Sequence, residues 1–359
     1  MRKKEVKTNL IVAAAFVAIL LIALYGLINY KYTLVKKAPT NNQAAYHALI
    51  GANQLYTNGK YVDAIEQYKK SIEIDPKLYN AYLGLGNSYI ELGIYDEAIK
   101  TFEKTLNGYF DYRTLYGLGL ANYVREDYQQ AYFYLMSAYK LNSKNRPVVS
   151  YLTNTYNALG LYDEAINLAN ENLIDNPKNH HLYRKIAVSY LLKGDSNNAL
   201  ENINIALQIN DSYHSNHEVL GQIYLYDSNP QLAIKEFKIT LGKYKSSWTY
   251  EELSVAYYIL GDNKSSEENA KLATLYSPHS FSLSSLGFIL LKNKKYEKAI
   301  EKFEAAINAK PSYYLPYKGL GKVYMELGQK EKAVYYLKKS AELNKLDKEV
   351  KKLLDEVNS

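Results

Sequence analysis

Four histidines are the residues of this chain whose type and grouping could bind a metal ion. His180 and His181 form one pair, and His214 and His217 form a second pair further along the chain. Neutral imidazole is a common metal ligand, so two such pairs brought together would make a candidate site. No cysteine or carboxylate accompanies them at ligand spacing. We therefore expect exposed or helix-capping histidines and no bound metal.

Three Gly-x-Gly sequences raise the possibility of a nucleotide-binding loop. They are Gly84-Leu85-Gly86, Gly117-Leu118-Gly119 and Gly319-Leu320-Gly321. A phosphate-binding loop of this kind needs a preceding strand and a third glycine three residues later. Neither feature accompanies any of the three, and all three fall in the middle of an expected helix. Close packing between helices explains them better than a nucleotide does.

Catalytic signatures are absent from the sequence. There is no P-loop, no HExxH motif and no nucleophile elbow. The absence of cysteine excludes disulfides, thiolate zinc sites, a cysteine nucleophile and lipid attachment to cysteine. A repeated helical pattern accounts for nearly all of the folded chain, which leaves no stretch for a catalytic domain. We predict that the protein is not an enzyme and uses no cofactor.

The pattern that positions all these residues is seen in residues 79–110. Tyr82, Leu85, Gly86 and Tyr89 recur at the spacing of one helix face. Gly93 then favours a helix end, because glycine readily adopts the left-handed conformation found just past a C-terminus. A second helix with acidic residues in its first turn follows, as the helix dipole favours. The stretch therefore predicts two short amphipathic helices joined by a tight turn.

This pair of helices recurs with a period of 33 or 34 residues. The small residue that begins the core face of the second helix shows the register best. It recurs at Ala64, Ala98, Ala131, Ala165, Ala199, Ala233, Ser266, Ala299 and Ala333. We predict nine repeats over residues 45–344. The third repeat lacks the turn glycine and has Glu126 in its place, and the sixth has Ser228-Asn229-Pro230 in its turn.

The repeat resembles the tetratricopeptide repeat, whose pattern is W-x2-L-G-x2-Y followed by A-x3-F and a closing Pro. Here the matching residues read Leu85-Gly86-x2-Tyr89 and Ala98-x3-Phe102. The resemblance implies an all-α fold, a right-handed α-solenoid. It also implies that the inner, concave surface binds a peptide segment or a protein partner. Nucleic acid is not expected as a partner, because the basic excess of the chain lies in residues 1–38, around an apolar segment.

The resemblance implies that the concave face is lined by those first-helix residues that the packing pattern does not use. One shared repeat position carries asparagine in three of the first four repeats and Leu120 in the third. An amide both donates and accepts hydrogen bonds, so a row of amides can pair with an extended peptide backbone. We predict a binding surface formed by Asn53, Asn87, Asn154, Arg113, Tyr116, Tyr123 and Arg184.

Beyond these residues the implied lining becomes apolar or aromatic. It comprises Val188, Trp248, Val255, Tyr258, Phe281 and Phe288. The simpler alternative is that asparagine is common in this chain and that these side chains are only solvated. The lysine and asparagine clamp with which some family members hold a C-terminal carboxylate is not reproduced, so binding of a chaperone tail is not implied.

The N-terminal segment has the character of a membrane anchor. The 19 residues from Leu10 to Ile28 carry no charge and would span about 28 Å as a helix. Residues 1–38 hold seven basic residues and one acidic residue, and so contribute +6 of the net charge of +7. We predict a basic tail at 1–9, a transmembrane signal-anchor helix at 10–30 that contacts the lipid bilayer, and a short linker at 31–44.

Charge on either side of the apolar segment bears on its orientation. Four basic residues precede it and three follow closely. The positive-inside rule therefore favours a cytoplasmic N-terminus and an extracytoplasmic repeat body. A cleaved signal peptide is the alternative, but its apolar region is usually shorter and ends in small residues.

The C-terminal residues 345–359 predict a helix that caps the array. Leu346, Val350, Leu353, Leu354 and Val357 fall on one stripe, opposite lysines and acidic residues. Such a helix covers the apolar face that the last repeat of an array exposes. The first repeat has no equivalent helix, so its end is a candidate contact for a partner or for self-association.

The sequence thus indicates a membrane-anchored scaffold or adaptor in the assembly or maintenance of a cell-envelope complex. Anchoring would raise the effective concentration of its partner near the same surface. Two alternatives remain open: a regulator whose superhelix changes pitch when a short peptide binds, and a docking domain for an enzyme supplied in trans.

Overall fold

The computed structural model describes residues 43–106 and 111–358, which form 19 α-helices and no strands. This agrees with an α-solenoid of tetratricopeptide type. The predicted anchor at 10–30 lies outside the described residues. None of the described helices combines the length and the apolar character that a membrane crossing requires. The chain divides after Asn172 into two compact units, which we call unit 1 and unit 2.

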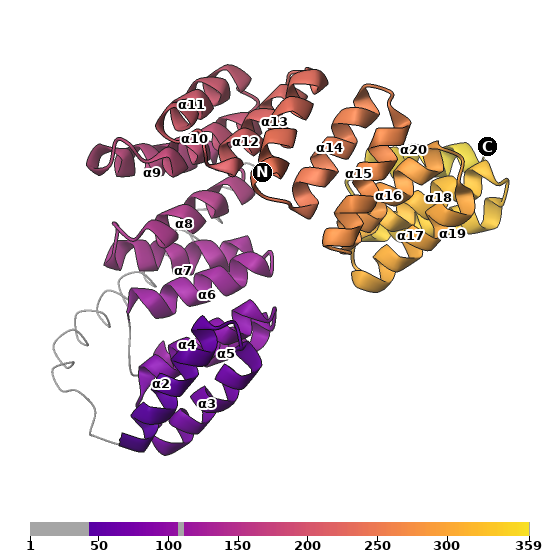
Figure 1. Ribbon diagram of the computed structural model, residues 1–359. Coiled ribbons are helices and arrows are strands. Elements are labelled where there is room, and N and C mark those ends of the chain that lie inside the picture. The colour runs from indigo at the N-terminus through magenta and orange to yellow at the C-terminus, as the bar shows by residue number, and fades with distance from the viewer. Residues whose placement is uncertain (1–42, 107–110, 359) are drawn as a thin grey trace, which may run out of the picture. The chain divides into compact units, whose positions relative to one another are not determined.

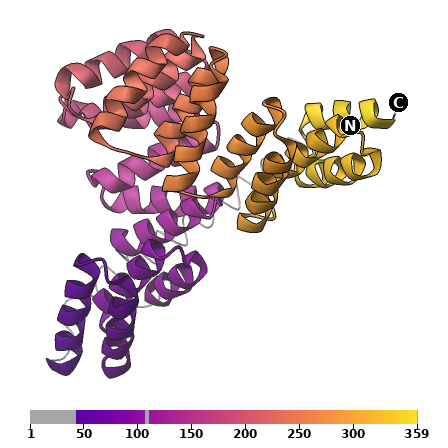
Figure 2. The ribbon, with the colours of Figure 1, turned by 45° about the vertical axis from the view of Figure 1, so that its right-hand side comes forward.

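Unit 1 consists of consecutive antiparallel helix pairs, as Figures 1 and 2 show in indigo to magenta. Its helices are α2 (Gln43–Thr57), α3 (Tyr61–Ile74), α4 (Tyr79–Glu91), α5 (Tyr95–Leu106), α6 (Tyr112–Val124), α7 (Tyr128–Leu141), α8 (Arg146–Ala158) and α9 (Tyr162–Asp175), the last of which crosses the division.

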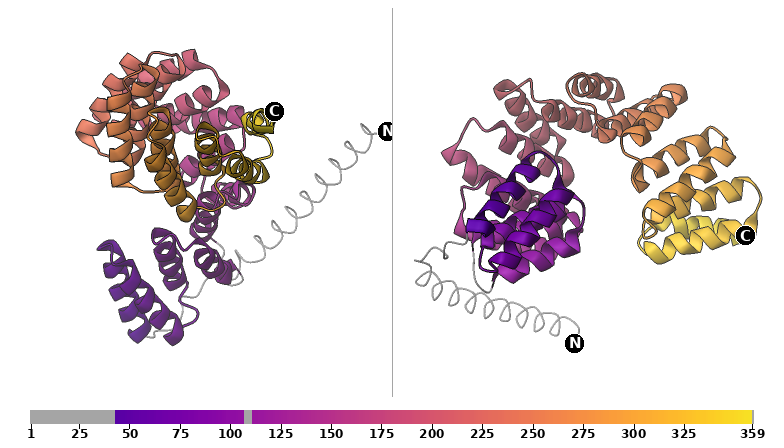
Figure 3. Two further views of the ribbon diagram at one scale, coloured as in Figure 1. Left: turned by 90° about the vertical axis from the view of Figure 1, so that its right-hand side faces the viewer. Right: turned by 60° about the horizontal axis from the view of Figure 1, so that its bottom comes forward.

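Unit 2 continues the pattern, in pink to yellow in Figure 3. Its helices are α10 (His180–Lys193), α11 (Ser196–Ile209), α12 (His214–Tyr226), α13 (Pro230–Lys243), α14 (Ser247–Ile259), α15 (Asn263–Tyr276), α16 (Ser280–Lys292), α17 (Tyr296–Ala309), α18 (Tyr314–Glu326), α19 (Lys330–Leu343) and α20 (Lys348–Asn358).

The two helices of each pair play different parts within a unit. The even-numbered first helices contact one another from pair to pair, as α14, α16 and α18 do. The odd-numbered second helices contact only first helices, namely the one before and the one after. The first helices therefore form one continuous layer, whose outer side is the candidate binding surface.

Two of the three Gly-x-Gly sequences follow a helix that carries a buried phenylalanine. In both places the phenylalanine ring lies between two glycines. A Cβ atom at Gly86 or at Gly117 would each lie 2.5 Å from the ring of Phe102. The ring of Phe303 is enclosed in the same way by Gly287 and Gly319. The glycines admit the ring by lacking a side chain, so the packing interpretation is confirmed.

The turn between the helices of a pair keeps its geometry where glycine is missing. Gly93, like most turn glycines, has a positive φ, here 74°. Glu126, Ser228 and Lys294 take its place in three repeats with φ of 66°, 58° and 56°. These side chains tolerate a left-handed conformation at some energetic cost. The sequence departures at these turns therefore leave the helix pairs intact.

The C-terminal helix α20 is held against α18 by charge as well as by apolar packing. Val350 is fully buried. The Lys318 Nζ lies 2.9 Å from Asp347 and 3.0 Å from Glu349, and Lys322 also pairs with Glu349. Leu346 is 89% exposed, so its predicted place on the packed stripe is wrong. It precedes the first turn of α20.

The glycine contacts yield a first prediction. Gly86→Ala should destabilise the full-length chain by about 1–3 kcal/mol, because Gly117 prevents the Phe102 ring from moving aside. Gly51→Ala is the control, since a Cβ there meets no atom within 4 Å. Removing this helical glycine should raise stability by about 0.5–1 kcal/mol. Thermal unfolding measures both, and equal effects of the two variants would contradict the packing account.

The ion pairs of α20 yield a second prediction. Hydrogen bonds from Lys322 and Lys318 lower the pKa of Glu349 to about 2, from an ordinary value of 4.5. A lowered pKa stabilises the folded state above pH 4.5, and this contribution is lost as the pH falls toward 2. Lys318→Met should weaken the docking of α20 by about 1–3 kcal/mol at pH 7, because Asp347 would lose its lysine partner.

Protection of the α20 amides from hydrogen exchange measures this docking. Exposed Lys351→Met is the control and should leave protection unchanged. The difference between Lys318→Met and the unaltered chain should shrink as the pH falls below 4.5. A difference that stays constant down to pH 2 would refute the ion-pair explanation.

Candidate functional site

The three predicted asparagines all lie on first helices of unit 1, on α2, α4 and α8. Asn53 and Asn87 are exposed, and Asn154 is half-buried. The Oδ1 of Asn53 accepts a hydrogen bond of 2.7 Å from the Tyr68 hydroxyl. One acceptor of the row is therefore engaged within the chain. That the row pairs with a peptide backbone stays a prediction.

Tyr116 and Tyr123 meet through a third tyrosine that the sequence reading did not include. Both rings contact the ring of Tyr151 edge-on, with centroids 5.9 and 5.6 Å away. Burial raises the pKa of Tyr116 and of Tyr123, so both phenols stay neutral. Arg113 is exposed at the start of α6, where its Nε donates to Asp111 at 2.8 Å.

Arg184 belongs to unit 2, whereas the other six predicted residues belong to unit 1. Its guanidinium carbon lies 5.6 Å from the ring centre of Tyr213. Its Nε is buried without a hydrogen-bond partner in the described part of the chain, and burial lowers its pKa. Six of the seven predicted residues thus lie in unit 1 and one in unit 2, and their shared role in binding stays a prediction.

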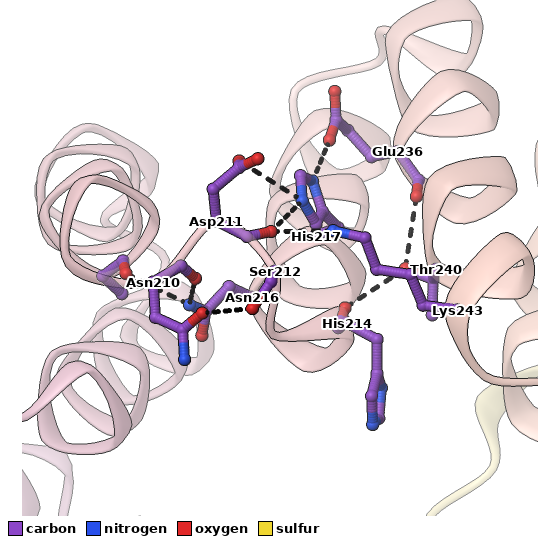
Figure 4. Close-up of polar contacts among 10 residues, drawn as sticks. Asn210, Asp211, Ser212, His214, Asn216, His217, Glu236, Thr240 and Lys243 are labelled. Atoms are coloured by element: carbon purple, nitrogen blue, oxygen red, sulfur yellow. Dashed lines mark hydrogen bonds and ion pairs between the residues drawn. The ribbon is translucent and has the colours of Figure 1, made fainter.

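His217 is buried, which corrects the expectation of exposed or capping histidines (Figure 4). Its Nδ1 lies 2.8 Å from the Glu236 carboxylate, and its Nε2 lies 2.9 Å from the Asp211 carbonyl oxygen. The sequence reading missed Glu236 because it lies on the next helix. Within the described residues, no three His, Asp or Glu side chains form a group that could hold a metal ion.

A concave site lies on the first helices of unit 2. A pocket of about 380 Å³ is lined by Glu251, Ser254, Val255, Tyr258, Ser285, Phe288, Ile289, Leu291, Lys292 and Lys322. A second pocket of about 370 Å³ adjoins it, and is lined by Leu291, Lys292, Lys294, Tyr296, Lys322, Met325, Glu326, Leu353 and Glu356. The two share Leu291, Lys292 and Lys322. Together they form what we call the unit 2 groove, which crosses α14, α16, α18 and α20.

Apolar and aromatic side chains give this surface its character. Val255 is 47% exposed and Tyr258 40% exposed, although both are apolar enough to favour burial. Nearby, the ring of Trp248 on α14 stacks on that of Phe281 on α16, with centroids 6.2 Å apart. Phe288 lines the groove as well. The apolar lining that the resemblance implied is therefore present on α14 and α16.

The charged residues of the groove escaped the sequence prediction, and three of them line the first pocket. Burial raises the pKa of Glu251 to about 7. The Nζ of Lys292 lies 3.7 Å from the ring centre of Tyr258, a cation–π contact. Lys322 pairs with Glu349 of α20. Lys322 occupies the repeat position of Asn53 and Asn87, so extending that comparison to the last repeat would have found it.

Parts of the chain match models of known families. Residues 52–93 match a TPR repeat model, residues 80–109 a tetratricopeptide repeat model, and residues 288–359 the model of regulator of microtubule dynamics protein 1-3. A TPR repeat-containing protein of Methanocaldococcus jannaschii is 28% identical over 315 residues, which cover 81% of this chain and 55% of the relative. The chain thus spans about half the length of that relative.

Solved structures share the helical-repeat architecture. The APC/C hetero-tetramer Cut9-Hcn1 aligns over 94% of this chain and 82% of its own, with a TM-score of 0.56 and 13% identity, which concerns the fold alone. YrrB, described as a TPR protein with an unusual peptide-binding site, is 25% identical over 52% of this chain and 93% of its own, with a TM-score of 0.43.

None of these matches indicates an enzyme family. The two repeat models cover only part of the array, so the count of nine repeats stays a prediction. Two family models and the described helix pairs agree on the nature of the repeat unit. The chain contains tetratricopeptide repeats.

Proposed function

We propose that the unit 2 groove binds an extended segment of a partner protein, and that the chain is a scaffold. Tetratricopeptide-repeat proteins generally act as scaffolds that bind proteins or peptides. The observation that carries the proposal is the pair of adjoining pockets across α14, α16, α18 and α20. An elongated groove of this kind suits a polypeptide segment better than a compact small molecule.

Composition of the groove supports a protein ligand. Its exposed apolar residues would gain by leaving water, at about 25 cal/mol per Å² of apolar surface. Aromatic residues such as Tyr258 and Phe288 supply contact area at little cost in side-chain entropy. Lysines at the shared wall of the two pockets add polar contacts. The combination is typical of a surface with an apolar centre and a polar rim.

Selection from a displayed library of random peptides of about 12 residues tests the groove, with the full-length chain in a mild detergent. Peptides enriched on the unaltered chain should bind Val255→Glu at least about tenfold more weakly, because a charge would then face their apolar side chains. Leu275→Glu makes the same kind of change on α15 at a position 77% exposed and outside the groove. It should leave binding unchanged.

The same peptides decide whether the asparagine row contributes. If Asn53, Asn87 and Asn154 are all changed to alanine and the enriched peptides lose affinity, the row takes part in binding. If Val255→Glu leaves the affinity of every enriched peptide intact, the groove is not the binding site.

We further propose that the apolar segment at 10–30 holds this scaffold at a membrane, with the repeat body on the extracytoplasmic side. The support is the uncharged run from Leu10 to Ile28 and the excess of basic residues before it. A role in assembling or maintaining a cell-envelope complex would follow from that location. Tethering raises the effective concentration of a partner at the same surface, without any new contact.

Fractionation of bacterial cells that express the full-length chain tests this proposal. The chain should stay with membranes after alkaline carbonate extraction, and deletion of residues 10–30 should release it. Protease added outside intact spheroplasts should digest the repeats. Release of the full-length chain by carbonate would refute the anchor, and protected repeats would refute the orientation.

A further inference from the structure

Two rows of side chains enclose the first pocket of the unit 2 groove. Glu251, Val255 and Tyr258 follow one another at i, i+4 and i+7 along one face of α14. Phe288 and Lys292 follow one another in the same way along α16. The pocket of about 380 Å³ between the rows has room for a long side chain. Its walls are mainly apolar, and Glu251 is its one acidic lining residue.

Glu251 is buried in this pocket without a full set of partners. The residue is only 4% exposed. Its Oε1 accepts a hydrogen bond of 3.3 Å from Ser247 and lies 3.7 Å from the His279 Nε2. Its Oε2 is buried and has no hydrogen-bond partner in the described part of the chain. A buried carboxylate in this state is costly, and a donor that reaches it recovers much of that cost.

The same repeat position is filled differently elsewhere. In the second repeat it is Leu83, which is buried and apolar. In the ninth repeat it is Lys318, which is 9% exposed and pairs with Asp347 of the segment that follows. For Glu251, the following first helix offers Ser284, whose hydroxyl bonds within its own helix. Glu251 is therefore a buried carboxyl group to which the next repeat brings His279 at 3.7 Å, but no lysine or arginine.

Two lysines also line the pocket, and each has another contact. The Lys292 ammonium lies over the Tyr258 ring, and Lys322 pairs with Glu349. Among the described residues, no lysine or arginine forms an ion pair with Glu251. A cation that pairs with Glu251 would therefore come from outside the chain.

The remaining walls suit the stem of a long basic side chain. Val255 and Tyr258 present exposed apolar surface beside the carboxylate. Lysine and arginine bury their methylene stems against such surface while the charged end reaches a polar group.

On the basis of the proposed function, we propose that this pocket takes a lysine or arginine side chain of the bound segment, with its cation at Glu251 and its stem against Val255 and Tyr258. The pocket would thereby add a charge requirement to an otherwise apolar groove. A segment with a basic residue among apolar ones would be preferred over an apolar or acidic segment.

Two displayed libraries of random peptides of about 12 residues test the inference on the full-length chain, one with all amino acids and one without lysine and arginine. Binders from the first should share a basic residue. Its replacement by neutral citrulline or norleucine should weaken binding at least about tenfold, and Glu251→Gln should remove that difference. Glu252→Gln is the matched control, because Glu252 does not line the pocket. It should leave the difference in place.

The outcomes separate this inference from the proposed function. If the library without basic residues gives equally tight binders that Val255→Glu still weakens, the groove binds segments but Glu251 is not a cation site. If Val255→Glu affects binders from neither library, both proposals fail. The citrulline and norleucine peptides use the unaltered protein, so the inference stays testable even if Glu251→Gln does not fold.

Discussion

The packing of several repeats depends on a large buried side chain placed against helical glycines. Phe102 comes from the second helix of one repeat, Gly86 from the first helix of the same repeat, and Gly117 from the first helix of the next. One ring thus holds a helix pair together and also joins it to its neighbour. Because a Cβ on either glycine would overlap the ring, the helices can approach this closely only where glycine is kept.

This constraint determines which residues are left for binding. The side of a first helix that faces the second helices is committed to packing. Residues on its outer side can change without disturbing the array, and they do change from repeat to repeat. The position held by Asn53 and Asn87 in unit 1 holds Val255, Phe288 and Lys322 in unit 2. The two units therefore offer chemically different surfaces on the same backbone.

Much of the fold could be predicted from the sequence, because the helical register is set by contacts that recur every 33 or 34 residues. Predictions failed where the position of a residue depends on another helix or on where a helix begins. His217 was expected at the surface, but it is buried against Glu236 of the following helix. Leu346 fitted an apolar stripe, yet the chain turns into α20 only after it. Glu251 could not be recognised in advance, because its pocket needs side chains from three first helices.

The C-terminal helix shows how a polypeptide segment can be held on the first-helix surface. α20 lies against α18 and α19, and buries Val350. Its acidic residues Asp347 and Glu349 reach back to lysines of α18. Apolar burial positions the segment, and opposite charge at a buried repeat position selects it. Glu251 lies at the position equivalent to Lys318, with the opposite sign, and α16, which takes the place of α20 there, brings no lysine or arginine to it. The same combination of forces, with the charges reversed, would hold a basic segment on α14 and α16.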